Sequence, residues 1–180
     1  MEENQKIPMR NQVKKEDTWA IEDMYATVED WEKDFAAAKK VAEEAAEYAG
    51  RLGESAQALY DWSALTEKLD CMLSEIYGYA SRVKDQDTAD AAGQTLSARA
   101  MGLYVECSGL ISFADPEILS IPEEKLEAFY AEKPELLKYR RSINEVRRCK
   151  DHILSPELEK ILADAGEMAV SYTHLTLPTT

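Results

Sequence analysis

Glycine and proline are scarce in this 180-residue chain, which contains seven and six of them respectively. Few turn-forming residues favour helices over a β fold, because short strands need frequent turns. No apolar run approaches the roughly 20 residues needed to cross a bilayer. The polar residues 1–15 also lack the apolar centre of a secretory signal. These absences predict an all-α protein that has no transmembrane segment and does not bind a membrane.

Cysteine and histidine are also rare. The three cysteines, Cys71, Cys107 and Cys149, are odd in number and far apart, which favours a reduced, cytoplasmic compartment over a disulfide framework. The two histidines, His152 and His174, do not form an H-E-x-x-H motif, and no cysteine pair has metal-ligand spacing. The sequence therefore assigns no catalytic, metal-binding or cofactor-binding residue.

Positive charge is in deficit, with 21 Lys and Arg against 35 Asp and Glu and a net charge of -14. Nucleic acid and anionic membrane attract basic clusters. The one short cluster, Arg140-Arg141 followed by Arg147-Arg148, has helical spacing and is interpreted as a solvated face. We therefore expect no nucleic-acid partner.

What the sequence does contain is apolar residues at alternating steps of three and four, the pattern of a helix with one buried side. The first stretch follows Thr27, a predicted N-cap with Asp30, and is expected to stop at Gly50 and Gly53. The three stretches are Val28, Trp31, Phe35, Ala38, Ala42, Ala45, Ala49 and Leu52; then Trp62, Leu65, Leu69, Met72, Ile76, Tyr79 and Val83; then Leu96, Ala100, Leu103, Cys107, Leu110 and Ala114. They predict three antiparallel helices of about 22–25 residues each, roughly 35 Å long.

The connections are predicted from capping residues, glycine and proline. A short separate helix over residues 56–61 is expected before the second stretch, and Asp87 or Thr88 is expected to cap the third. Gly102 and Gly109 are expected to admit a close neighbour helix. Shorter helices should open at four proline-containing sites, and the last should bury an apolar stripe. The openings are Asp115-Pro116, Pro122, Pro134 and Ser155-Pro156, and the last stripe is Leu158, Ile161, Leu162 and Ala165.

The chain is thus expected to consist of a polar segment, residues 1–15, a helical domain, residues 16–168, and a tail, residues 169–180. The tail contains no charged residue, and its string SYTHLTLPT resembles translated sequencing-adaptor read-through. We interpret it as non-native.

Four ordered segments carry a resemblance to a known family. Residues 17–25 (DTWAIEDMY) resemble a W-x-L-x-D-L-Y element, and residues 76–88 resemble a Y-x-Y-A…D-x-D-T element. Residues 112–119 (SFADPEIL) are similar to S-F-x-x-P-E-I-L, and residues 152–163 to H-x-L-S-x-E-x-E-x-L-L-A. The ordered set is similar to the beginning of oligoendopeptidase F.

The resemblance implies the N-terminal helical segment of a cytosolic zinc metalloendopeptidase that hydrolyses short peptides. In that family the N-terminal helices form part of the wall of an enclosed cleft, and zinc is held much further downstream. It follows that this chain, taken as truncated, should bind no zinc and be inactive alone. The oligomeric state stays open. The alternative is a stand-alone acidic helical module, a coiled coil or adaptor, since the same stripes could bind a partner helix.

Overall fold

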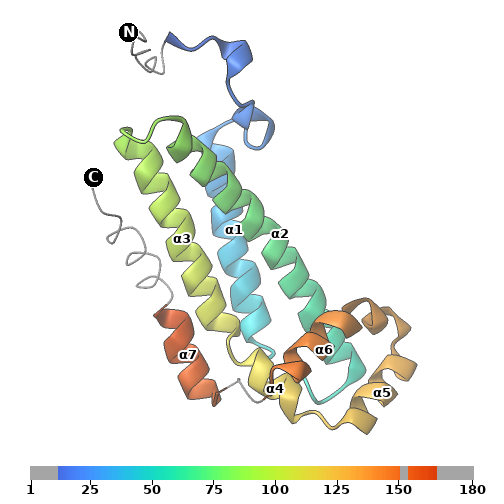
Figure 1. Cartoon of the computed structure of the whole chain (residues 1–180). Coiled ribbons are helices and arrows are strands. Elements are labelled where there is room, and N and C mark those ends of the chain that lie inside the picture. The colour runs from blue at the N-terminus through green and yellow to red at the C-terminus, as the bar shows by residue number, and fades with distance from the viewer. Residues whose placement is uncertain (1–11, 151–153, 166–180) are drawn as a thin grey trace, which may run out of the picture.

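The computed structural model describes residues 12–150 and 154–165. All regular elements in these ranges are helical and none is a strand, which confirms the all-α prediction. Three long helices run side by side in alternating directions and contact one another pairwise (Figure 1). They are α1 (Val28–Ala46), α2 (Ala56–Gln86) and α3 (Ala91–Ile111).

Shorter elements cover the ends and one side of this bundle. At one end lie α4 (Ala114–Ser120), α5 (Glu123–Glu132), the 3-10 helix η4 (Pro134–Tyr139) and α6 (Arg140–Arg148) (Figure 1). The 3-10 turns η2 (Lys15–Asp17) and η3 (Ile21–Asp23) precede α1, and α7 (Pro156–Asp164) lies against α3.

Helix α1 begins as predicted, because the Thr27 Oγ accepts a hydrogen bond from the Asp30 N–H at 3.2 Å. It ends at Ala46, however, earlier than its apolar stripe suggested. Residues 47–54 are turns, with Gly50 in the left-handed region at φ 80°. Leu52 is fully buried but lies in this turn and not in the helix.

Helix α2 is one continuous helix of 31 residues, about 46 Å long at 1.5 Å per residue. The separate helix predicted over residues 56–61 is therefore wrong. Ser55 caps the whole element by accepting from the Ala58 N–H at 3.1 Å, and no glycine or proline interrupts the chain before Gly78.

The turn between α2 and α3 uses carboxylates as helix caps. Asp90, and neither Asp87 nor Thr88, is the N-cap of α3, accepting from the N–H groups of Ala92 (3.2 Å) and Gly93 (3.0 Å). Asp87 instead accepts from the Ala89 N–H at 3.0 Å and shapes the turn that precedes the cap.

Two apolar clusters fill the interior. The first lies between the three long helices, where Leu69, Ile76 and Cys107 are completely buried and Leu103 nearly so. The second joins the ends of α1 and α2 to α4, α5, η4 and α6, around Leu52, Leu59 and Leu136. Most of the core predicted for the long helices is confirmed, but Val28 at 47% exposure and Ala49 lie on the surface. Tyr77, whose helical spacing also predicted a core position, is 40% exposed.

The shorter helices depart from prediction in their boundaries. Helix α4 begins at Ala114, before the predicted Asp115-Pro116 cap, because Ser112 and Phe113 keep a helical backbone and turn α3 directly into α4. Pro134 opens a 3-10 helix, and α6 follows from Arg140. Gly109 does face a close neighbour, α7, whereas a side chain at Gly102 would meet open space.

Helix α7 reverses the predicted side. Leu158, Ile161 and Leu162, expected to be buried, are 48%, 60% and 56% exposed. The helix approaches α3 with its charged side: a Cβ at Gly109 would lie 2.8 Å from the Asp164 carboxylate. The apolar stripe is consequently left on the outside.

Candidate functional site

Two of the resemblance motifs meet at the N-terminal end of α1. The Tyr25 and Tyr79 rings pack edge to face with centroids 5.2 Å apart, and the Tyr25 hydroxyl donates to Asp34 at 3.0 Å. Burial and the Asp34 carboxylate raise the pKa of Tyr25 above its ordinary value. A Cβ at Gly78 would lie 3.3 Å from the Met24 methyl, so these two motif residues are in close contact. These motif residues build the fold.

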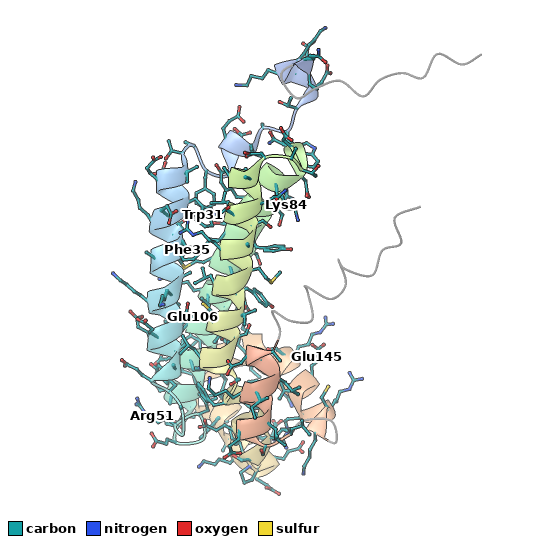
Figure 2. The ribbon with its side chains drawn as sticks, turned by 90° about the vertical axis from the view of Figure 1, so that its left-hand side faces the viewer. Trp31, Phe35, Arg51, Lys84, Glu106 and Glu145 are labelled. Atoms are coloured by element: carbon teal, nitrogen blue, oxygen red, sulfur yellow. The ribbon has the colours of Figure 1, made fainter. Side chains whose placement is uncertain are left out.

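An aromatic and charged contact joins α1 to α2 and α3. Trp31 and Phe35 project from α1 between the long helices (Figure 2), and the Trp31 Nε1 donates to the Ile76 carbonyl at 3.0 Å. Arg99 stacks within 5.2 Å of both ring centroids and binds the Glu32 carboxylate through two nitrogens, at 2.5 and 2.8 Å. The hydrogen bond from Arg99 lowers the pKa of Glu32. The carboxylate is paired, as expected of a structural contact.

The turn after α1 is held by a motif residue distant in sequence. The Glu117 carboxylate on α4 accepts from the N–H groups of Gly50, at 2.9 Å, and Leu52, at 2.6 Å. Glu117 belongs to the SFADPEIL element, so this part of the resemblance also has a structural role.

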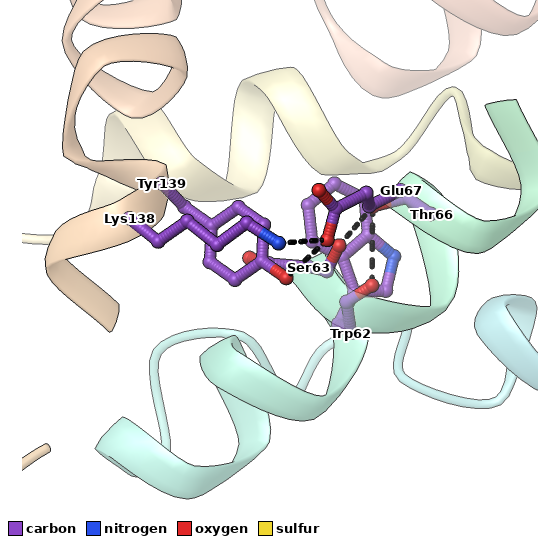
Figure 3. A network of polar contacts seen from close by, with 6 residues as sticks. All are labelled: Trp62, Ser63, Thr66, Glu67, Lys138 and Tyr139. Carbon is purple, nitrogen blue, oxygen red and sulfur yellow. Dashed lines mark hydrogen bonds and ion pairs between the residues drawn. The ribbon is translucent and has the colours of Figure 1, made fainter. Parts of the chain in front are cut away.

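A hollow of about 420 Å³, which we call the polar hollow, opens between α2, α4 and α6. Figure 3 shows the network at its edge: the Glu67 carboxylate accepts from the Lys138 Nζ at 2.5 Å and the Tyr139 hydroxyl at 2.8 Å. The hydrogen bond from Lys138 is the main cause that lowers the pKa of Glu67. The hollow is lined by Trp62, Ser63, Thr66, Glu67, Asp70, Cys71, Ile111, Asp115, Ile118, Tyr139, Ser142, Ile143 and Val146.

The lining combines carboxylates and hydroxyls with an isoleucine floor, a composition suited to binding. Its volume lies in the usual range of small-ligand pockets, roughly 300–1,000 Å³. The Ser63 hydroxyl donates to the Leu59 carbonyl of its own helix at 2.7 Å, so it is not paired with a base. Partial burial raises the pKa of Asp70 above its ordinary value. This arrangement can hold hydrogen-bonding and cationic groups, and it contains no assembled nucleophile.

A second hollow, of about 460 Å³, which we call the apolar hollow, lies between α2, α3 and α7. Its lining is almost entirely apolar and consists of Tyr77, Met101, Tyr104, Val105, Ser108, Leu162 and Ala163. Tyr77 and Tyr104 are 40% and 51% exposed, so the hollow continues onto an open surface. Such a lining suits burial against another apolar surface more than recognition of a polar ligand.

The described residues do not fit a zinc site. Within 12–150 and 154–165, no three His, Cys, Asp or Glu side chains are placed to share a metal ion. Cys107 is fully buried, which raises its pKa to about 11, whereas Cys71 and Cys149 are exposed and unbonded. His152 and His174 lie outside the described residues. None of the described helices is long and apolar enough to span a membrane.

Comparison with known sequences shows to which family the chain belongs. The family model described as Oligopeptidase F matches residues 117–173. Oligopeptidase PepF of Bacillus subtilis is 38% identical over 162 residues, which cover 90% of this chain and 24% of that protein. This chain belongs to the oligoendopeptidase F family. Group B oligopeptidase PepB of Streptococcus agalactiae is 32% identical, over 88% of this chain and 26% of the relative.

The structural comparison agrees with this family. The crystal structure of oligoendopeptidase F from Enterococcus faecium superposes with a TM-score of 0.72 at 27% identity, over 79% of this chain and 28% of that one. A peptidase structure from Chlamydophila abortus, at 22% identity and TM-score 0.73, shares the fold. The chain spans about a quarter of the length of the curated relatives it matches, in their N-terminal region.

Proposed function

We propose that this chain forms the N-terminal helical wall beside the substrate cleft of a cytoplasmic oligoendopeptidase F-like zinc metalloendopeptidase that hydrolyses short peptides. The similarity to PepF over 90% of the chain carries the proposal. In the proposed arrangement, the zinc ligands and the catalytic base come from polypeptide outside this chain. The isolated chain is then expected neither to bind zinc nor to cleave peptides.

The polar hollow is the surface that we propose faces the peptide. Asp70 presents carboxylate oxygens beside an apolar floor, next to the Glu67 carboxylate that Lys138 and Tyr139 hold in place. A flexible peptide offers both N–H donors and apolar side chains, so it matches this mixture. The hollow would contribute to substrate affinity while taking no part in bond cleavage.

A chimera tests this function. Residues 16–165 of this chain would replace the matching N-terminal part of Bacillus subtilis PepF, and hydrolysis of a short fluorogenic peptide would be measured. The chimera should bind zinc and cleave the peptide, and the isolated 180-residue chain should do neither. Chelator-sensitive cleavage by the isolated chain, or a folded, zinc-loaded chimera without activity, would refute the proposal.

Substitution in the polar hollow tests its contact with the peptide. Asp70→Asn in the chimera should raise KM severalfold with little change in kcat, because it removes a binding group distant from the reacting bond. Glu44→Gln, on the exposed side of α1, is the matched control and should leave both constants unchanged. Equal constants for the two variants would mean that the peptide does not reach this hollow.

A further inference from the structure

Exposed apolar side chains gather on one side of this molecule. Of the ten large apolar side chains that are substantially exposed in the described residues, three line the apolar hollow and two more stand on α7 with the last of these three. They are Tyr77, Tyr104 and Leu162, then Leu158 and Ile161. Met101 and Val105 extend the same surface between the two tyrosines and α7. We call these seven residues the α7 face.

The orientation of α7 sets this face apart from an ordinary surface. A helix on the outside of a soluble domain normally turns its apolar stripe inward and its charges outward. In α7 the Lys160–Asp164 ion pair, 3.3 Å long, lies on the side that meets α3 at Gly109. Leu158, Ile161 and Leu162 are instead 48%, 60% and 56% exposed, on a helix that Figure 1 shows beside α3.

Charge and length both bear on what covers this face. A second copy would bring together two chains that each carry a net charge of -14, which opposes self-association. The curated relatives, by contrast, contain about three times as much further polypeptide beyond the part that matches this chain. That polypeptide must pack against the N-terminal helices somewhere, and a group of exposed apolar side chains beside a hollow is suited to such packing.

We propose that the α7 face is the packing surface for the remaining part of the oligoendopeptidase F polypeptide, whose apolar side chains fill the hollow between Tyr104 and Leu162. This inference rests on the proposed function, since it assumes a larger peptidase. It assigns the two hollows different tasks: the apolar one holds the enzyme together, and the polar one meets substrate.

The test supplies the remaining part as a separate polypeptide. The complete 180-residue chain is immobilised, and binding of Bacillus subtilis PepF lacking its matched N-terminal region is measured. We expect binding that Ile161→Glu weakens by about tenfold or more, because a carboxylate would be buried against apolar groups. The matched control is Leu137→Glu, whose parent side chain is 48% exposed but lies on η4, away from this face. Binding that the two variants weaken equally would overturn the proposal.

Light scattering on the chain alone distinguishes a second copy as the occupant. A dimer that Ile161→Glu converts to a monomer, with no binding to the shortened relative, would overturn the proposal.

If the shortened relative does not fold, thermal unfolding of the chimera replaces the binding assay. In the chimera, Ile161→Glu should lower the Tm by several degrees more than Leu137→Glu. An equal decrease in Tm for the two variants would contradict the proposal. Peptide hydrolysis is read separately, so an inactive chimera stabilised through Ile161 would refute the function and leave the interface standing.

Discussion

In the three-helix bundle, apolar residues at steps of three and four are buried, whereas in α7 residues with similar spacing lie on the solvent side. Leu69 and Ile76 on α2 are completely buried, but Ile161 on α7 is 60% exposed. The spacing specifies a helix with one apolar side. It carries no information on which element covers that side. In the bundle the cover comes from within the chain, and for α7 we propose that it comes from the rest of the polypeptide.

The same two regions differ in how their helices begin. Asp90 caps α3 with two hydrogen bonds to backbone N–H groups, and Ser55 caps α2 with one. Ser155, at the corresponding position before α7, makes no side-chain cap. The bundle is therefore fixed both by its core and by its helix ends, whereas α7 has weaker support at both levels.

The largest expected difference concerns the core. In the 180-residue chain, Leu69→Ala should lower the free energy of unfolding by about 2–5 kcal/mol, because it opens a cavity in a closed core. Ile161→Ala should change it by no more than about 0.5 kcal/mol, since the side chain is mostly in water. Urea unfolding followed by circular dichroism measures both values.

Ile76→Ala and Leu103→Ala serve as replicates, because both side chains belong to the same cluster as Leu69. A cost at Ile161 as large as at these positions would show that α7 is covered within the isolated chain. That result would remove the contrast between the two regions.

A smaller difference is expected at the helix ends. Asp90→Ala should cost about 1 kcal/mol, within the usual range of about 0.5–2, because two N–H groups of α3 lose their partner. Ser155→Ala should cost close to nothing. Unfolding midpoints of the two variants, compared at equal m-values, check this prediction, and a larger loss at Ser155 would contradict it.

The bundle could be predicted from sequence because its information is local. Thr27 with Asp30 predicted the start of α1, and the apolar stripes predicted the cores of α1, α2 and α3. Boundaries were harder, because some depend on distant residues: Glu117 on α4 holds the turn at Gly50 and Leu52. No pattern within α1 records that contact.

The polar hollow could not be predicted for the same reason. Glu67 lies 71 positions from Lys138 and 72 from Tyr139, and none of the three belongs to the motifs that suggested the family. Glu117 could have been suspected, since it stands in the SFADPEIL element. The exposure of α7 depends on what packs against it, and the spacing of the residues within α7 does not specify that neighbour.

The smallest expected effect compares two carboxylates, Asp70 in the polar hollow and Glu44 on the outside of α1. Partial burial raises the pKa of Asp70 above 3.8, so the folded chain holds this proton more tightly than the unfolded chain. The protonated form therefore favours folding below that value, and this contribution is lost as pH rises through the raised pKa. Asp70→Asn, which stays neutral, should raise the Tm at pH 7 and give little gain near pH 3. The gain should be small because Asp70 is exposed at the rim of the polar hollow.

Glu44→Gln removes the same charge from a chain of net charge -14 and so controls for general repulsion. Thermal unfolding of both variants between pH 3 and pH 7 gives the answer. Identical pH profiles would mean that the Asp70 carboxylate is as well hydrated as one on an open helix, and that the polar hollow is too shallow to distinguish it from the rest of the surface.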